Sequence, residues 1–122
     1  MTPGPKDLLP QPPWEGPPIP GFMATRPTGT CYEDAWRFIL KEEEGELVHG
    51  TAISFGHAWV ELPLGYIWEP YSKAYFTKEG FQALFDPVEE HRYTLKEALV
   101  MAVRSSNFGP WTSKERSRWI GR

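Results

Sequence analysis

The sequence predicts a single α+β domain, because helical and strand patterns alternate along one short chain. Two capping boxes, Thr30 to Glu33 and Thr94 to Glu97, each precede an apolar pattern with helical spacing. Between them, short segments rich in β-branched and aromatic residues are separated by glycine-containing turns. The chain has 122 residues, enough for one modest hydrophobic core. Short connections favour an antiparallel sheet, with the first helix packed on it.

Three helices are expected. The first has Thr30 as its cap, Cys31 at its first position and an end at Gly45. Its buried face is expected to contain Tyr32, Ala35, Trp36 and Ile39. The second covers 78–85 and is capped by Thr77. The third follows Thr94, and its apolar face is expected to contain Leu95, Ala98, Leu99, Ala102 and Val103.

The strand patterns cover 46–53, 57–62 and 66–70, and residues 88–93 form a candidate fourth strand. If Pro63, Leu64 and Gly65 make the turn, Leu62 faces Tyr66. Glu69 then lies diagonally across from His57 on the same face of the sheet. Diagonal neighbours are roughly 7–8 Å apart at the backbone, within reach of a long carboxylate.

The chain divides by composition into three parts. Residues 1–21 hold eight of the thirteen prolines, which predicts an extended leader attached to the domain by Trp14, Ile19 and Phe22. Residues 22–112 form the domain. Residues 113–122 carry a net charge of +3 and are interpreted as a basic, solvated and frayed tail.

Composition also limits the function. A net charge of −3 argues against a nucleic-acid binder. A single cysteine excludes an internal disulfide and is typical of a reducing compartment. No signal-peptide pattern is seen, and no run approaches the ~20 apolar residues of a membrane helix. We therefore expect a cytoplasmic protein that needs neither a membrane nor a cofactor; its oligomeric state is not readable.

The lone cysteine is the first candidate for chemistry. A helix start offers free N–H groups and a dipole that favour the thiolate, the reactive form of Cys31. The same N–H groups suit an oxyanion on an attacked carbonyl. Glu33 and Asp34 oppose this, because negative neighbours raise a thiol pKa. Cys31 therefore needs a nearby base.

His57 is the candidate base, since it begins a strand directly after Gly56. Glu69 is the candidate acceptor that fixes the tautomer and orientation of the imidazole. Glu61 and Tyr71 share its parity and are weaker candidates. The candidates for a substrate cleft are Gly29, Thr30 and Trp59.

The segments "GHAWVEL" and "GYIWEP" resemble the histidine and acid strands of transglutaminase-like proteins, within the papain-like cysteine hydrolase fold. "TGTCYEDAW" stands where that fold has its nucleophile helix. The resemblance implies Cys31 as nucleophile, His57 as general base and acid, and Glu69, usually Asp or Asn in that fold, as the orienting residue. It implies acyl transfer on an amide or peptide-like carbonyl. Residues 28–112 are also similar to small uncharacterised proteins of phages and their bacterial hosts.

Two other readings remain. Cys31, His49, His57 and His91 are possible zinc ligands, but no pair has a short ligand spacing, and His49 is expected opposite residue 60 or 61 rather than 57. We therefore expect no metal. The second reading is a catalytically inactive accessory or interaction protein that uses its aromatic surface and basic tail to bind a partner.

Overall fold

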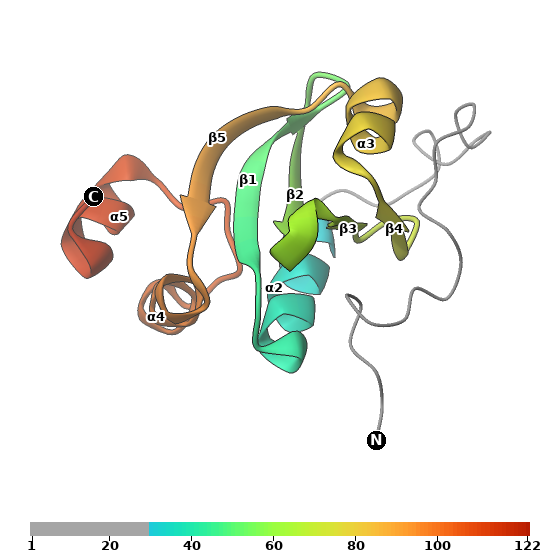
Figure 1. The fold of residues 1–122 in the computed structure, drawn as a ribbon. Helices are drawn as coiled ribbons and strands as arrows, with labels where there is room; N and C mark the ends of the chain where they lie inside the picture. The colour runs from blue at the N-terminus through green and yellow to red at the C-terminus, as the bar shows by residue number, and fades with distance from the viewer. Residues whose placement is uncertain (1–29) are drawn as a thin grey trace.

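The computed structural model describes residues 30–122, which form a mixed α+β fold (Figure 1). The elements are, in chain order, α2 (Thr30–Glu42), β1 (Glu46–Ala52), β2 (Phe55–Glu61), the 3₁₀ turn η1 (Pro63–Gly65), β3 (Ile67–Glu69), β4 (Ala74–Phe76), α3 (Lys78–Phe85), β5 (Val88–Tyr93), α4 (Leu95–Ser105) and α5 (Ser113–Ile120). The predicted leader and Gly29 lie outside the described residues. Within 30–122, no helix combines the length and apolar character needed to cross a membrane.

Helix α2 begins one residue earlier than the sequence predicts, so Cys31 is its second residue. Thr30 therefore belongs to the helix itself, and the carboxylate of Glu33 accepts a hydrogen bond from Arg37 Nε at 2.8 Å. The predicted role of Thr30 as a cap is wrong for this reason. The predicted buried stripe is confirmed for Tyr32, Ala35 and Ile39, whereas Trp36 is half-buried.

The caps of the next two helices are confirmed. Thr77 accepts a hydrogen bond from the Gly80 N–H at 2.9 Å, and α3 spans the predicted residues. Thr94 and Glu97 form the capping box of α4. The predicted face of α4 is partly wrong: Leu99 and Val103 are 42% and 66% exposed.

Ala98 and Ala102 of the predicted face are buried, and Met101, which was not predicted, is buried with them. These positions have the same helical spacing as the predicted set, so contacts with the rest of the fold decide which apolar stripe turns inward.

The five strands form one antiparallel sheet in the order β4-β3-β2-β1-β5. The β1–β2 hairpin turns through Ile53 and Ser54, both with positive φ, and Ala52 pairs with Phe55. This two-residue loop is shorter than the turn at 54–56 that the predicted strand bounds leave. His49 is therefore opposite Ala58 in β2, not residue 60 or 61 as predicted.

Each face of the sheet carries its own apolar core. Residues of α2, α4 and the segment before α5 pack on one face against Leu47, Ala58 and Val60. Helix α3 covers the other face, where Phe81 and Phe85 pack among Val48, Trp59, Ile67 and Phe76. Figure 1 shows α3 and α4 on opposite sides of the sheet. A strand in the middle of this sheet is consequently buried on both faces, as its sequence predicts for β2.

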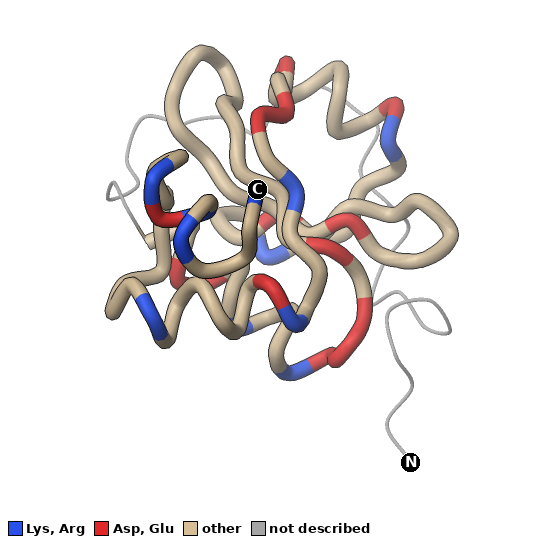
Figure 2. Tube along the Cα trace, turned by 90° about the vertical axis from the view of Figure 1, so that its left-hand side faces the viewer, with Lys and Arg blue, Asp and Glu red and all other residues tan. Residues whose placement is uncertain are grey.

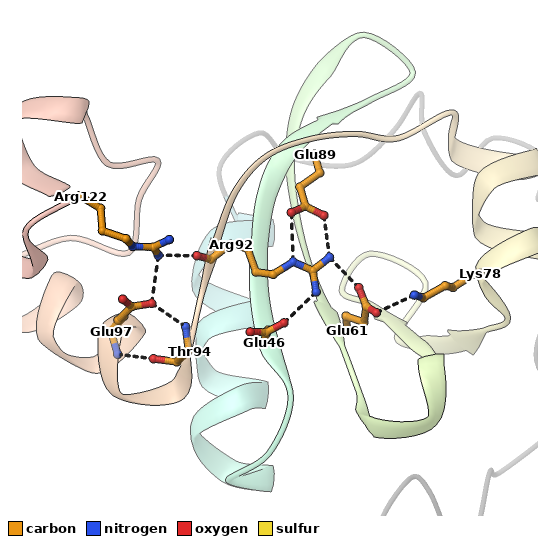
Figure 3. Close-up of polar contacts among 8 residues, drawn as sticks. All are labelled: Glu46, Glu61, Lys78, Glu89, Arg92, Thr94, Glu97 and Arg122. Atoms are coloured by element: carbon orange, nitrogen blue, oxygen red, sulfur yellow. Dashed lines mark hydrogen bonds and ion pairs between the residues drawn. The ribbon is translucent and has the colours of Figure 1, made fainter.

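The basic C-terminal segment is a helix, which contradicts its interpretation as a frayed tail. Thr112 and Glu115 form a capping box at the start of α5. The buried guanidinium of Arg116 donates to the Trp111 carbonyl at 2.7 Å, and Trp119 and Ile120 pack on the core that α4 shares. Arg122 donates to the Arg92 carbonyl at 2.6 Å and to Glu97 at 3.0 Å (Figure 3).

A network of charged side chains ties the sheet to α3 (Figure 3). Arg92 of β5 contacts Glu46 of β1 at 2.8 Å, Glu61 of β2 at 2.7 Å and Glu89 at 2.6 Å. Lys78 of α3 contacts Glu61 at 2.8 Å. Two cations thus share three carboxylates, which come from three strands. By contrast, the acidic run 42–44 at the C-terminal end of α2 is the longest continuous red stretch of the trace in Figure 2 and is exposed or half-buried, as expected of a solvated helix end.

Candidate functional site

The register of the second hairpin brings His57 and Glu69 together. Val60 pairs with Trp68, and the Leu62 N–H donates to the Tyr66 carbonyl at 2.7 Å. This is the register that the sequence predicts from a turn at 63–65. It places His57 of β2 and Glu69 of β3 diagonally across from each other, so their side chains can meet.

His57 and Glu69 form a buried polar pair. His57 Nε2 lies 2.8 Å from Glu69 Oε2, and neither side chain has exposed surface. The pKa of His57 is raised: burial lowers it, but the hydrogen bonds with Cys31 and Glu69 and their negative charges outweigh burial. The imidazole is thus held toward its protonated form, with Nε2 committed to the carboxylate.

The turn after β3 holds Glu69 from the other side. Its Oε2 also accepts the Tyr71 N–H at 3.0 Å, and its Oε1 accepts the Ser72 N–H and Ser72 Oγ, each at 2.7 Å. Burial raises the pKa of Glu69, but His57 and these N–H groups lower it by more, so the net pKa is lowered. The carboxylate is therefore ionised and fixed, as an orienting residue must be.

The side chain of Cys31, in α2, contacts the His57 side of the His57–Glu69 pair. Its side chain has no exposed surface. Burial raises the thiol pKa, yet hydrogen bonds with His57 and Tyr71, the charge of His57 and the backbone of Ala58 lower it, and the net pKa falls below 9.0. His57 Nδ1, the ring nitrogen that Glu69 does not use, makes no hydrogen bond of ordinary geometry with any described residue. The imidazole–carboxylate contact thus has ordinary hydrogen-bond geometry, whereas the thiol–imidazole contact does not.

The acidic residues beside Cys31 are paired with cations. Glu33 contacts Arg37 at 2.8 Å, and Asp34 lies 3.9 Å from Lys73. These partners offset part of the negative charge that the sequence places next to the thiol. The pKa of Cys31 is nevertheless lowered by His57, by Tyr71 and by the backbone of Ala58.

The other predicted site residues lie apart from the sulfur or at its edge. Trp59 is buried among the aromatic residues under α3, with its ring centroid 6.1 Å from that of His57. It lines a pocket of about 200 Å³ between α3 and β5. Thr30 is exposed at the start of α2. Glu61 belongs to the Arg92 network, which rules it out as the partner of His57.

The sequence does not predict Ser72 as a site residue, and it predicts Tyr71 only as a weak candidate for the orienting role. Ser72 binds Glu69 twice, and Tyr71, considered only as an orienting residue, contacts Cys31, His57 and Glu69. Both follow the strand in the run E-P-Y-S, where an acid accepts N–H groups two and three residues further on. That local turn was the available signal.

The pockets lined by Trp59, by Leu64 and by Trp119 do not include Cys31, His57 or Glu69. All three side chains lack exposed surface.

The four residues considered as possible zinc ligands do not form a metal-binding cluster. Within residues 30–122, no group of three or more His, Cys, Asp or Glu side chains could hold a metal ion. His49 pairs with Ala58 on one side and His91 on the other. Its ring packs against Tyr32 and Trp111, and burial first, then the charges of His91 and Arg116, lower its pKa to about 3.

The structure brings three of the predicted residues, Cys31, His57 and Glu69, into one buried cluster, and it adds Tyr71 and Ser72. Trp59 neighbours that cluster from the α3 side. Comparison of the chain with protein-family models, with curated proteins and with solved structures gives no match.

Proposed function

We propose that this protein is a cysteine hydrolase or acyltransferase that acts on an amide or peptide-like carbonyl. Cys31 is the nucleophile, His57 the general base and acid, and Glu69 the residue that orients the imidazole. One observation carries the proposal: a buried imidazole is bound through Nε2 to an ionised carboxylate and also interacts with the Cys31 thiol, while its Nδ1 is not bonded to any other described residue. That division of the two nitrogens is what a histidine base requires.

The reaction proceeds through a thioester. The Cys31 thiolate attacks the carbonyl carbon, a C–S bond forms, and the π electrons of the carbonyl move to its oxygen. The oxyanion then collapses, the C–N bond breaks, and the His57 imidazolium gives its proton to the departing amine. Water or a second amine next gives a proton to His57 and attacks the thioester. Collapse releases the acid or the new amide and restores the thiolate–imidazolium pair.

The arrangement supports a papain-like or transglutaminase-like core. A thiol in the first turn of a helix, a histidine at the start of a strand and an acid on the adjacent strand occur in that order along the chain. Glu69 is one methylene longer than the Asp or Asn usual there. The diagonal register between β2 and β3 accommodates the longer side chain, because Nε2 and Oε2 still meet at 2.8 Å.

The second candidate is an inactive accessory protein that retains this fold. One observation favours it: Cys31, His57 and Glu69 have no exposed surface. In that case the cluster is a satisfied polar part of the core, and the thiol never meets a substrate.

The titration of the single thiol distinguishes the two. The ultraviolet absorbance of a thiolate needs no reagent to enter the site, and Cys31→Ser supplies the tyrosine background. We expect the wild-type thiolate to form well below pH 9.0, the ordinary value of the group. His57→Ala should return the titration to the ordinary range, whereas His91→Ala, which removes an exposed histidine, should leave it unchanged. A wild-type titration at or above the ordinary value would overturn the proposal.

Alkylation then tests whether a reagent can reach the Cys31 thiol. Iodoacetamide should alkylate Cys31 in the folded protein with the same pH midpoint as the absorbance. An activated ester of a short acyl group should add one acyl group to the wild type and none to Cys31→Ser, as read by intact mass. A low thiolate midpoint without any acylation would favour the accessory protein.

A further inference from the structure

Tyr71 lies against all three residues of the candidate site. Its backbone N–H donates to Glu69 Oε2 at 3.0 Å. Its ring is tilted by 35° to the His57 ring, with centroids 4.7 Å apart. The side chain is half-buried, whereas that of His57 has no exposed surface. The Tyr71 ring therefore lies over the imidazole at the side of the site that retains some exposure.

The hydroxyl of Tyr71 extends this contact to the sulfur. It is a hydrogen-bond partner of the Cys31 thiol, and together with His57 and the Ala58 backbone it lowers the thiol pKa against the effect of burial. The other side chain that lowers the thiol pKa is the imidazole of His57, which is fully buried. Two polar groups thus converge on one sulfur.

We infer that Tyr71 is a fourth residue of the site, whose hydroxyl donates a hydrogen bond to the Cys31 sulfur while its ring covers the imidazole. This inference rests on the proposed function, since a donor at the sulfur matters only if the thiolate reacts. A phenol stabilises a thiolate without adding a charge that would compete with Glu69 for the imidazolium. Tyr71 therefore widens the pH range of the reactive thiolate toward lower pH.

Other titratable groups near the sulfur are accounted for. Tyr32 follows Cys31 on α2, and its pKa is raised to about 12 by burial and by the charges of Cys31 and Glu90, so it stays neutral. Glu33 and Asp34, on the same helix, are paired with Arg37 and Lys73. Glu69 acts on the sulfur through His57. Among these groups, Tyr71 is the one whose hydroxyl is a partner of the sulfur.

Tyr71→Phe and Tyr71→Ala separate the two roles. Phenylalanine keeps the ring over His57 and removes only the hydroxyl, so the thiolate titration should move up by about one pH unit. Its alkylation rate at high pH, where the thiolate is fully formed, should equal that of the wild type. Alanine should give the same shift and also a rate roughly several-fold higher at high pH, because the covering ring is lost.

Tyr75→Phe is the matched control. Tyr75 is also half-buried, but it lies on β4 beside Phe38, with ring centroids 6.2 Å apart. It should titrate and alkylate as the wild type does. Thermal unfolding of each variant establishes that the fold is kept, and Tyr71→Phe, which preserves the ring, is the variant expected to keep it.

The outcomes are distinct. If the wild-type thiolate forms at low pH and Tyr71→Phe titrates identically, the role of Tyr71 is wrong while the proposed function stands. If the wild type itself behaves as an ordinary thiol, the proposed function fails, and the inference fails with it. A shift in Tyr71→Phe without one in Tyr75→Phe supports the inference.

Discussion

Glu69 shows how much of the site depends on one side chain. Its two oxygens accept four hydrogen bonds, one from His57, one from Tyr71 and two from Ser72. A buried carboxylate is costly unless each lone pair finds a donor, and here the donors come from a strand and from a turn. The same contacts that keep the carboxylate ionised also prevent it from rotating, so the imidazole is held in one orientation.

Glu69→Gln is therefore expected to damage both the fold and the thiol. An amide cannot accept on both sides, so either the Ser72 donors or those of His57 and Tyr71 face an NH₂ group. We expect the free energy of unfolding, measured with urea at neutral pH, to fall by about 3 kcal/mol. The thiolate titration of Cys31 should move upward, because the imidazolium loses its counter-charge. Glu89→Gln, at an exposed partner of Arg92, should cost less than ~1 kcal/mol and leave the thiol unchanged.

The stability lost in Glu69→Gln depends on pH, and the pKa of Glu69 fixes the direction of that dependence. The pKa of Glu69 is lowered from 4.5 in the folded protein. Its contribution to stability is therefore complete above pH 4.5 and disappears as the pH falls through the folded value. The stability difference between the wild type and Glu69→Gln should shrink in acid over that range. A constant difference down to the acid transition would contradict the ionised, paired carboxylate.

At this scale the sequence predicts the three candidate site residues but not the residues that hold them in place. Cys31, His57 and Glu69 are identified by residue type, order and one assumed turn, and the turn at 63–65 has the assumed register. Ser72 and the hydroxyl of Tyr71 are different. Their contacts depend on how the chain turns between β3 and β4. The run E-P-Y-S is a signal for a turn whose N–H groups bind the acid, but it does not specify where the Tyr71 hydroxyl lies.

Among the elements, those predicted from local signals match the structure best. Helix α3 has the predicted bounds because its cap and the following proline are local features. Helix α5 was missed although T-S-K-E at 112–115 is a capping-box pattern. Its charges suggested a solvated tail. What makes it stable is tertiary: Arg116 binds the Trp111 carbonyl, and Trp119 packs on the core.

The role of α5 can be measured through its cap. Thr112 accepts the Glu115 N–H at 3.1 Å, and Glu115 accepts the Thr112 N–H at 2.9 Å. If α5 folds together with the domain, Thr112→Ala should lower the global free energy of unfolding by about 1 kcal/mol. Ser113→Ala alters an exposed residue inside the helix rather than at its cap. It should change the free energy of unfolding by less than ~0.5 kcal/mol. Equal stabilities of both variants and the wild type would mean that α5 contributes nothing to global folding.

For the whole molecule, the important feature is that the site joins the two cores. Cys31 belongs to the core beneath α2 and α4, whereas the His57 ring lies 6.3 Å, between centroids, from Phe85 in the core under α3. The two meet at the start of β2, beside the exposed residues 53–56 of the hairpin. Of the residues that meet there, Cys31 lies in the first turn of α2 and Tyr71 in the turn between β3 and β4, so both are outside the strands of the sheet.

This arrangement predicts that Cys31 becomes accessible by local opening. Local opening exposes little new surface, so its free energy depends weakly on denaturant, whereas global unfolding has the full dependence. The rate of iodoacetamide labelling, measured in increasing urea well below the unfolding transition, should therefore rise much less steeply than the equilibrium constant of unfolding. Tyr71→Ala should raise the labelling rate without urea and leave its urea dependence weak. A labelling rate that follows global unfolding from the lowest urea concentration would show that the folded protein keeps its thiol closed, and the accessory-protein reading would then be the better one.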